Sequence, residues 1–424
     1  MLSAERLPDP VDEGVLRFLT CGSVDDGKST LIGRLLLDTK SILADALSAI
    51  EATSRRRGHE VVDLSLLTDG LQAEREQGIT IDVAYRYFAT ATRKYIIADA
   101  PGHEQYTRNM VTAASTAHLA IILVDARKGV LTQTRRHAYL AHLVGIPHLV
   151  VAVNKMDLVG WSRDVFERIQ RDTLAFAERL GIEDVRFIPI SAVTGDMVVE
   201  RGERLGWYTG PTLLELLEAA PAAHTERREA FRFPVQWVCR PQTAEHHDFR
   251  GFAGRVESGE IAVGDAVRVL PSGRETRVKE IRLGEVRLAR AESEQSVMLV
   301  LEDEVDVSRG DLLARPDDAP EPTRRLDAVL CWLSERPLSP QRRYLVRHTT
   351  RESKAQLAEI AWRVDLAALE QVPAETLAMN DIGRVSLRLA APIAADPYVS
   401  SRATGAIIVV DEATNDTVGA GMIL

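Results

Sequence analysis

The segment Gly22-Ser23-Val24-Asp25-Asp26-Gly27-Lys28-Ser29-Thr30 decides the fold of this 424-residue chain. It has the pattern G-x-x-x-x-G-K-[ST] and lies between an apolar run at Val15–Leu19 and a helix-forming run at Leu31–Leu37. A strand, a glycine-rich loop and a helix in this order form a P-loop, whose backbone N–H groups and helix N-terminus face phosphates. We expect Lys28 to reach the β- and γ-phosphates of a nucleoside triphosphate and the Ser29 hydroxyl to bind Mg²⁺. The alternative, a glycine-rich turn without a ligand, is less consistent with both the pattern and its context.

The composition is that of an ordinary globular protein, with 45% hydrophobic and 27% charged residues. No stretch approaches the ~20 apolar residues of a membrane span, and the acidic, proline-containing N-terminus does not resemble a signal peptide. The three cysteines are far apart, which favours a reducing cytosol. The net charge of −10 argues against broad nucleic-acid affinity. We therefore expect a cytoplasmic protein that binds neither membranes nor nucleic acid.

Three domains are predicted after an N-terminal tail at residues 1–14. Residues 15–221 alternate between strand-like and helical runs, which predicts a mostly parallel sheet with helices on both faces. Residues 230–316 and 325–424 contain short strand-like runs separated by turn signals, which is typical of small barrels. The sequence thus predicts an α/β P-loop domain followed by two small all-β barrel domains.

Particular elements of these domains can be predicted from apolar periodicity. The strands expected in the first domain are Val15–Leu19, Val83–Phe88, Tyr95–Ala98, Ala120–Val124, His148–Val153 and Arg186–Ile190. The helices expected there are Thr30–Leu37, Gln105–Ala117, Gln133–Val144, Arg163–Leu180 and Thr212–Ala219. In the barrels we expect strands that include Ala266–Leu270, Ser296–Leu301 and Ala328–Leu333, with a linker at Asp317–Pro322.

Three features after the P-loop point to hydrolysis of the nucleotide. Asp99-Ala100-Pro101-Gly102 follows a predicted strand, so Asp99 can hold Mg²⁺ through water and the Gly102 N–H can meet the γ-phosphate. Thr80, in Gly-Ile-Thr, can close on Mg²⁺ when the γ-phosphate is present, although that tripeptide alone is more often a strand start. His103 can position the attacking water, the alternative being a surface histidine at a helix start.

A further hypothesis concerns the control of His103. Val24 and Ile79 are expected to flank this side chain. They would keep it out of its active position until a partner triggers hydrolysis. Small substitutions at Ile79 should then raise the unstimulated rate of nucleotide hydrolysis, and an unchanged rate would contradict the hypothesis.

The base is selected by Asn154-Lys155-Met156-Asp157, which follows a buried strand-like run. The Asp157 carboxylate can accept hydrogen bonds from guanine N1–H and the 2-amino group, whereas adenine offers no such donor pair. We expect Asn154 to brace the P-loop and the stem of Lys155 to lie over the base. Ser191-Ala192, after the next predicted strand, would supply a backbone N–H to the guanine oxygen. These residues predict GTP as the nucleotide.

Two other features are expected to have no role in chemistry. Cys21 beside the P-loop is expected to be a buried thiol at a strand end. Arg135-Arg136-His137, on a predicted helix, is expected to face solvent.

The order P-loop, Gly-Ile-Thr, Asp-x-Pro-Gly-His, Asn-Lys-x-Asp, Ser-Ala and two barrels resembles the translation-factor GTPase family over nearly the whole chain. Translation elongation factors usually carry Gly-His-Val-Asp-[His/Ala]-Gly-Lys, whereas this P-loop reads Gly-Ser-Val-Asp-Asp-Gly-Lys. That variant, with Leu31–Leu36, Thr68–Phe88 and Gln105–Met110, resembles the GTPase (large) subunit of the heteromeric bacterial sulfate adenylyltransferase.

This resemblance implies that GTP hydrolysis drives the formation of adenosine 5′-phosphosulfate and diphosphate from ATP and sulfate. It also implies that adenylyl transfer occurs on a separate small catalytic subunit, a pyrophosphate-loop protein. The present sequence has no Ser-Gly-Gly-x-Asp-Ser loop and no His-x-x-His signature, so no second ATP site is expected here. Some relatives carry a fused adenylylsulfate kinase with a second P-loop; none occurs here, so we expect the stand-alone form if the sequence is complete.

Two other functions compete with this reading. One is a translation factor that binds aminoacyl-tRNA or the ribosome, and the other is a GTP-binding scaffold without a coupled enzyme. The Asp26 variant, the net charge of −10 and the lack of an evident basic stripe in the barrels argue against the first. His103 argues against the second, because a scaffold needs no group that positions water.

Overall fold

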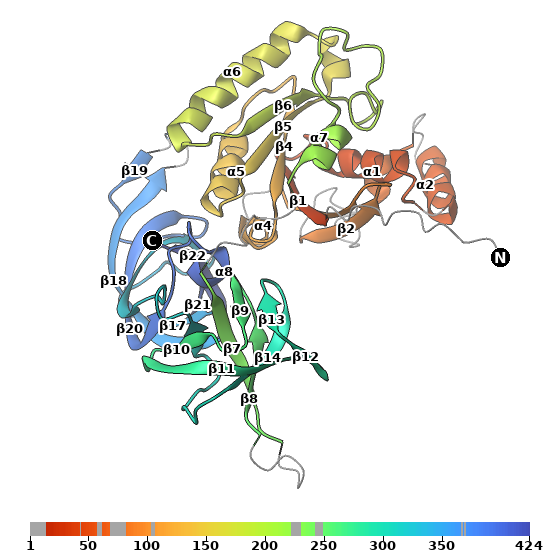
Figure 1. Ribbon diagram of the computed structural model, residues 1–424. Helices are drawn as coiled ribbons and strands as arrows, with labels where there is room; N and C mark the ends of the chain where they lie inside the picture. Colours follow the sequence, from red (N-terminus) through yellow and green to blue (C-terminus); the bar gives the residue numbers. More distant parts are fainter. Residues whose placement is uncertain are drawn as a thin grey trace, which may run out of the picture. The chain divides into compact units, whose positions relative to one another are not determined.

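Two compact units make up the chain in the computed structural model (Figure 1). The N-terminal unit extends to His224, and the C-terminal unit begins at Thr225. No helix in the described part of the chain is long and apolar enough to cross a membrane. The described residues are 14–42, 44–56, 62–67, 82–102, 107–221, 230–241, 249–365, 368 and 370–424.

A six-stranded sheet forms the centre of the N-terminal unit, with the strand order β2-β3-β1-β4-β5-β6. Its neighbouring strands are parallel, apart from the antiparallel edge pair of β2 and β3. Every residue of the central strand β4 is buried, as expected of a strand covered on both faces. The strands are β1 (Val15–Gly22), β2 (Ala84–Ala89), β3 (Lys94–Asp99), β4 (Leu119–Asp125), β5 (His148–Asn154) and β6 (Val185–Pro189).

Helices cover both faces of this sheet. Ile121 and Leu123 share a hydrophobic core with α1 and α7, whereas Ile122 between them faces α5 and α6. This alternation follows from the two-residue period of a strand. The α-helices are α1 (Lys28–Asp38), α2 (Ala44–Arg56), α4 (Thr107–Ala114), α5 (Thr132–Leu143), α6 (Arg163–Leu180) and α7 (Leu213–Ala219), with short 3₁₀ helices η1 (Leu64–Leu67) and η3 (Met156–Val159).

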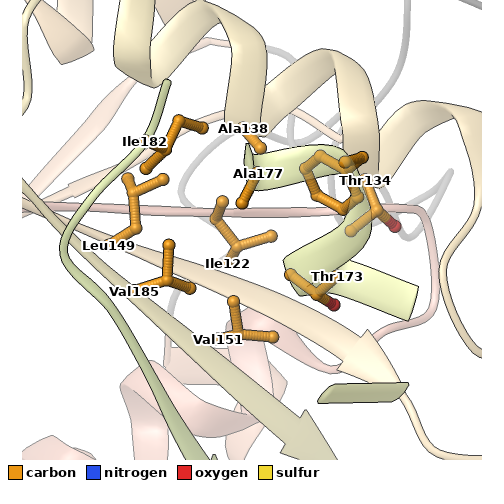
Figure 2. A pocket seen from close by; sticks show the side chains of 10 residues that line it. Ile122, Thr134, Ala138, Leu149, Val151, Thr173, Ala177, Ile182 and Val185 are labelled. Carbon is orange, nitrogen blue, oxygen red and sulfur yellow. The ribbon is translucent and has the colours of Figure 1, made fainter. Parts of the chain in front are cut away.

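A small cavity lies between the sheet and helices α5 and α6 (Figure 2). Its volume is about 10 Å³, and mostly apolar side chains such as Ile122, Val151 and Ala177 line it. The Thr173 hydroxyl at its edge donates to the Ile169 carbonyl, 2.8 Å away, and so has a partner within its own helix. On this measure a cavity needs about 10–15 Å³ and two or more polar partners to hold one water molecule. The cavity is therefore a packing gap in the core and not a ligand site.

The first part of the C-terminal unit is a closed antiparallel barrel. Six strands form a ring in the order β10-β15-β7-β8-β14-β11, which the pairing of β11 with β10 closes. Its interior holds aromatic and β-branched side chains, among them Phe233, Phe252 and Val269. The strands are β7 (Arg232–Cys239), β8 (Gly251–Arg255), β9 (Glu260–Ala262), β10 (Ala266–Leu270), β11 (Arg274–Leu283), β12 (Val286–Leu288), β13 (Arg290–Glu292), β14 (Ser296–Leu301) and β15 (Leu312–Ala314).

The second part of the same unit is another closed antiparallel barrel. Its ring has the order β17-β21-β22-β16-β20-β18 and closes through the pairing of β18 with β17. Trp332, Tyr344 and Leu387 lie in its core. Its elements are β16 (Pro322–Trp332), β17 (Tyr344–His348), β18 (Arg351–Asp365), β19 (Glu370–Val372), β20 (Ile382–Ala394), the short helix α8 (Arg402–Gly405), β21 (Ala406–Asp411) and β22 (Thr417–Ile423).

An ion-pair network centred on the buried Arg232 joins the two barrels. Arg232 on β7 donates from Nε and Nη2 to the two carboxylate oxygens of Asp396, both at 2.8 Å, and from Nη1 to Asp318 at 3.0 Å. Burial raises the pKa of Asp396, but the hydrogen bonds from Arg232 and Thr404 outweigh burial and hold this pKa below its ordinary value. The two barrels are therefore linked by charged groups that are paired inside the C-terminal unit.

This architecture confirms the predicted fold class. A P-loop domain with a mostly parallel sheet precedes two all-β barrels in the described residues.

Candidate nucleotide-binding site

The P-loop connects the end of β1 at Gly22 to the start of α1 at Lys28. Gly27 has a φ of 94°, and a Cβ there would lie 2.5 Å from Nδ2 of Asn154. Both the left-handed backbone and the close approach of Asn154 require glycine at this position. The glycine of the motif therefore shapes the turn and admits a side chain from a distant strand.

Lys28 is buried at the base of this loop. Its Nζ donates to the carbonyl oxygens of Gly22, at 2.9 Å, and Ser23, at 3.3 Å. Burial lowers the pKa of Lys28, while Asp99 and Asp26 nearby raise it. A buried ammonium group is costly unless negative charge lies close to it. The lysine thus supplies a positive charge at the point where the motif predicts phosphates.

The segment Asp99–Gly102 packs directly against the P-loop. A Cβ on Gly102 would lie 2.5 Å from Lys28 Nζ and 2.6 Å from the carbonyl oxygen of Gly22, so only glycine fits here. Asp99 is buried at the end of β3 and accepts a hydrogen bond from Thr20 Oγ1 at 3.3 Å. The structure therefore brings together two motifs that are more than 70 positions apart in the sequence.

Asp26 is folded into the P-loop, with only 1% of its surface exposed. Its Oδ2 accepts a hydrogen bond from the Ser23 N–H at 2.7 Å, and its Oδ1 has no partner among the described residues. Burial raises the pKa of Asp26 to about 6, although the Ser23 N–H and Lys28 lower it. This carboxyl group therefore closes the loop internally and titrates near neutral pH.

Asn154 joins the P-loop to the segment that follows β6. Its Nδ2 donates to the Asp26 carbonyl at 2.8 Å, and its Oδ1 accepts from the Ala192 N–H at 3.0 Å. The Ala192 N–H, which we expected to face guanine, is thus also bonded inside the protein, as is the Ser191 N–H, which donates to the Asp196 carbonyl. One side chain holds both the phosphate-binding and the expected base-binding segments.

Lys155 and Asp157 lie beside this junction. Lys155 has a left-handed φ of 64°, and its Nζ donates to the Asp25 carbonyl and lies 3.0 Å from Asp125 Oδ2. Asp157 is the second residue of the short 3₁₀ helix η3 and is half-buried, so its side chain is partly accessible. The Lys155 side chain therefore extends to the P-loop, and its expected position over a base stays a prediction.

Asp125 and Arg127 are site residues that sequence reasoning missed. Asp125 is buried at the end of β4, and Arg127 binds it from Nε at 3.0 Å and from Nη2 at 2.7 Å. Burial raises the pKa of Asp125, but the hydrogen bonds from Arg127 and Lys155 outweigh burial and hold this pKa well below its ordinary value. The sequence did contain a signal for Asp125, because it is an acidic residue at the carboxyl end of an apolar strand. Ligands bind at such ends in parallel sheets.

Four parallel strands deliver these residues to one edge of the sheet. β1 ends at Gly22, β3 at Asp99, β5 at Asn154 and β6 at Pro189, just before Ser191-Ala192. Of the predicted site residues, Thr80 and His103, with Ile79, lie outside the described residues. The others lie at or just after the carboxyl ends of β1, β3, β5 and β6, and they are Gly22 to Thr30, Asp99 to Gly102, Asn154, Lys155, Asp157, Ser191 and Ala192.

The expectation that His137 faces solvent was wrong. His137 on α5 is only 2% exposed, and its Nε2 lies 3.0 Å from Gln133 Nε2. Thr134, Ala138 and Ala141 share its buried stripe, so the helical period places this histidine against the sheet. Burial lowers the pKa of His137 to about 3, so the imidazole is neutral. Cys21, by contrast, is buried at a strand end as predicted, and burial raises the pKa of its thiol to about 12.

Comparison with known proteins identifies two families in the chain. Residues 13–223 match the elongation factor Tu GTP binding domain, so this domain binds GTP, and residues 325–424 match the GTP-eEF1A C-terminal domain-like family.

Several curated proteins resemble the chain over nearly its whole length. It is 55% identical over 412 residues to sulfate adenylyltransferase subunit 1 of Cellvibrio japonicus, covering 97% of this chain and 86% of that protein. It is 53% identical to sulfate adenylyltransferase subunit 1 of Alteromonas mediterranea, covering 97% of this chain and 87% of that one. It is also 52% identical to the bifunctional enzyme CysN/CysC of Mycobacterium tuberculosis, covering 97% of this chain and 67% of that protein. The chain therefore belongs to the sulfate adenylyltransferase subunit 1 family, a family of enzyme subunits built on a translation-factor-type GTPase domain.

Proposed function

We propose that this chain is the GTP-hydrolysing subunit of a heteromeric sulfate adenylyltransferase. Hydrolysis of GTP on this chain drives the formation of adenosine 5′-phosphosulfate and diphosphate from ATP and sulfate on a small catalytic partner subunit. The observation that carries the proposal is the Asn154 bridge between the P-loop and Ala192, in a chain 55% identical to sulfate adenylyltransferase subunit 1. That bridge supports a site in which phosphates and guanine are held together.

The phosphates bind in the P-loop. The backbone N–H groups that surround the loop and the N-terminus of α1 attract negative charge. Lys28 Nζ, which contacts the Gly22 and Ser23 carbonyls, is close enough to the loop interior to turn to a phosphate oxygen. The phosphate charge then compensates the burial of this ammonium group.

Ser29 and Asp99 are suited to hold Mg²⁺, together with Thr80. The ion prefers oxygen ligands and keeps several waters, so a site that also contains phosphates needs few protein groups. Ser29 is the second residue of α1, and the Asp99 carboxylate lies at the end of β3, so both are oxygen donors beside the P-loop. When bound, Mg²⁺ would neutralise charge that develops on the β- and γ-phosphates.

His103 positions the attacking water in this proposal. It follows Gly102, whose backbone lies against Lys28 and Gly22, so the chain enters the phosphate end of the site just before His103. A side chain there can orient water in line with the leaving group. Asp157 selects guanine through N1–H and the 2-amino group, and Ser191-Ala192 faces the guanine oxygen.

The coupling between the subunits is expected to be reciprocal. If GTP changes the affinity of this chain for the small subunit, the small subunit must change the affinity for GTP by the same factor. Such coupling needs two conformational states, one with the γ-phosphate bound and one without it. Loops around Thr80 and Asp99–His103 that respond to the γ-phosphate would supply these states.

The decisive experiment uses this chain purified together with the small catalytic subunit of its own organism. GTP hydrolysis and adenosine 5′-phosphosulfate formation are measured with ATP and sulfate, with each alone and with neither. We expect ATP and sulfate together to accelerate GTP hydrolysis, and a Lys28→Ala variant to lose both activities. An unchanged GTPase rate without adenosine 5′-phosphosulfate would overturn the proposal, and acceleration by ribosomes instead would support a translation factor.

A further inference from the structure

Arg34 connects the P-loop helix to the expected base-binding segment. It lies on α1, one and a half turns beyond Lys28, and its side chain is only 16% exposed. Its Nε donates to the Ala192 carbonyl at 3.1 Å, and its Nη2 donates to the Val193 carbonyl at 2.5 Å. The guanidinium group therefore spans two consecutive carbonyls that lie about 160 positions further along the chain.

The segment after Ala192 is packed closely on this arginine. Gly195 has a φ of 85°, and a Cβ there would lie 3.4 Å from both Arg34 Cδ and Asp38 Oδ2. Asp38, one turn further along α1, holds the remaining nitrogen Nη1 at 3.4 Å. Arg34 is thus oriented by its own helix before it reaches the segment.

Arg34 and Asn154 act on opposite sides of the same residue. Asn154 Oδ1 accepts the Ala192 N–H at 3.0 Å, whereas Arg34 Nε binds the Ala192 carbonyl. Both backbone polar groups of Ala192 are therefore fixed, one by a side chain from β5 and one by a side chain from α1. Because α1 begins at the P-loop, this second contact sets the distance between the phosphate end and the base end of the site.

We propose that Arg34 is a positioning residue for guanine: it holds Ser191–Val193 where this segment meets the 6-oxygen of the base. The inference rests on the proposed GTP site and assigns to it a residue that lies outside the nucleotide motifs. Arginine is suited to this role because two nitrogens of its rigid planar group, Nε and Nη2, each donate to one carbonyl, whereas a lysine has a single ammonium group on a flexible stem.

The test compares Arg34→Ala and Arg34→Lys with Arg163→Ala, a matched control. Arg163 also pairs with an acidic residue four positions away, Glu167 at 2.7 Å, but it is 63% exposed on α6. The dissociation constants of GDP, 6-thio-GDP and IDP are measured for each full-length variant. Sulfur is a weak acceptor, so 6-thio-GDP probes the 6-oxygen contact, whereas IDP lacks the 2-amino group that Asp157 is expected to bind.

We expect Arg34→Ala to weaken GDP binding about tenfold or more, since two hydrogen bonds from a charged donor are lost. In this variant, the dissociation constant of 6-thio-GDP divided by that of GDP should fall toward one. The dissociation constant of IDP divided by that of GDP should stay as in the unaltered chain. The GDP affinity of Arg34→Lys should lie between those of Arg34→Ala and the unaltered chain. Arg163→Ala should change neither ratio. The lysine variant keeps the test valid if the alanine variant does not fold.

Two results would overturn the inference. One is GDP affinity within about twofold of the unaltered chain in both Arg34 variants, and the other is an equal change for all three nucleotides. If the unaltered chain itself binds no GDP, the proposed GTP site fails first, and the role of Arg34 fails with it.

Discussion

Among the individual residues, Asn154 and Asp26 hold the P-loop through hydrogen bonds to its backbone. Asn154 makes the two contacts that hold the Asp26 carbonyl and the Ala192 N–H. Asp26 turns its carboxyl group back into the loop, where its Oδ2 accepts a hydrogen bond from the Ser23 N–H. The sequence predicted that Asn154 braces the P-loop, whereas the motif leaves the residue at Asp26 unspecified and did not predict its contact with the Ser23 N–H.

Asn154→Ala is expected to weaken GDP binding by about 100-fold or more. Each buried group left without its partner costs about 1–3 kcal/mol, and this substitution leaves two such groups. Asn154→Asp keeps an acceptor for the Ala192 N–H but loses the donor to the Asp26 carbonyl. Its affinity for GDP should therefore lie between those of the alanine variant and the unaltered chain. Isothermal titration of GDP checks both variants; an alanine variant that binds as tightly as the unaltered chain would show that the bridge is dispensable.

Asp26 should make stability depend on pH. Its pKa is about 6 in the folded chain against an ordinary 3.8, so the folded state favours the protonated carboxyl. The stability that this group contributes is complete below pH 3.8 and is lost as the pH rises through 6. Asp26→Asn should therefore be no more stable than the unaltered chain at pH 4 and more stable at pH 8.

Urea unfolding of both proteins at several pH values measures this difference. Parallel profiles for the two proteins would mean that Asp26 does not titrate in this range. Because the Asn oxygen can still accept from the Ser23 N–H, the substitution changes the charge and preserves the loop contact.

At the scale of the element, the best-predicted parts are those with strong periodicity. The helix α6 and the strands β10 and β14 have the bounds that the sequence predicts. Ser162 caps α6 by accepting from the Val165 N–H, and Gly181 ends it in the left-handed region, so local signals define both ends.

Other elements were missed because packing decides them. The helix α2 (Ala44–Arg56) was not predicted, and β16 begins at Pro322, the last residue of the expected linker, whereas the predicted strand began at Ala328. The strand β18 (Arg351–Asp365) was also missed, because its long alternation of polar and apolar residues gains meaning only from its neighbours β17 and β20.

Gly33→Ala tests the contact between α1 and η1. Alanine favours a helix over glycine by about 1 kcal/mol, but a Cβ at this position would lie 2.4 Å from the Leu64 carbonyl oxygen and 2.8 Å from its Cβ. Because the clash involves a backbone atom, its cost should exceed the gain in helix propensity. We therefore expect a net loss of stability of about 1–3 kcal/mol.

Gly206→Ala is the matched control, because a Cβ there meets nothing within 4 Å. Its free energy of unfolding should stay within about 0.5 kcal/mol of the unaltered chain. A Gly33→Ala variant as stable as this control would show that η1 shifts away from α1 without cost.

At the scale of the whole molecule, two compact units carry different tasks. The N-terminal unit collects the nucleotide site at the carboxyl ends of its strands, and the C-terminal unit consists of two closed barrels. Within the C-terminal unit, Arg232 binds Asp396 and Asp318 and so links one barrel to the other.

Asp396→Ala is expected to destabilise the C-terminal unit by about 3 kcal/mol or more, because it leaves the buried Arg232 without its bidentate partner. Asp306→Ala is the control, since Asp306 is 92% exposed and its pairing with Arg250 is loose, at 3.5 Å. Denaturant unfolding followed by tryptophan fluorescence, through Trp332 in the second barrel, measures both. GDP affinity should be the same in the two variants. Equal stability of Asp396→Ala and Asp306→Ala would contradict the role of the network.

The fold class and the order of the nucleotide motifs follow from the amino-acid sequence. Both depend on local information: the period of apolar residues, the glycines of the P-loop and the polar residues that end buried strands. Other contacts between distant side chains could be seen only in the folded chain. Arg34 reaches Ala192 and Arg232 reaches Asp396, each across more than 100 positions. Such contacts depend on the spacing of packed elements and on side-chain length, which no local pattern encodes.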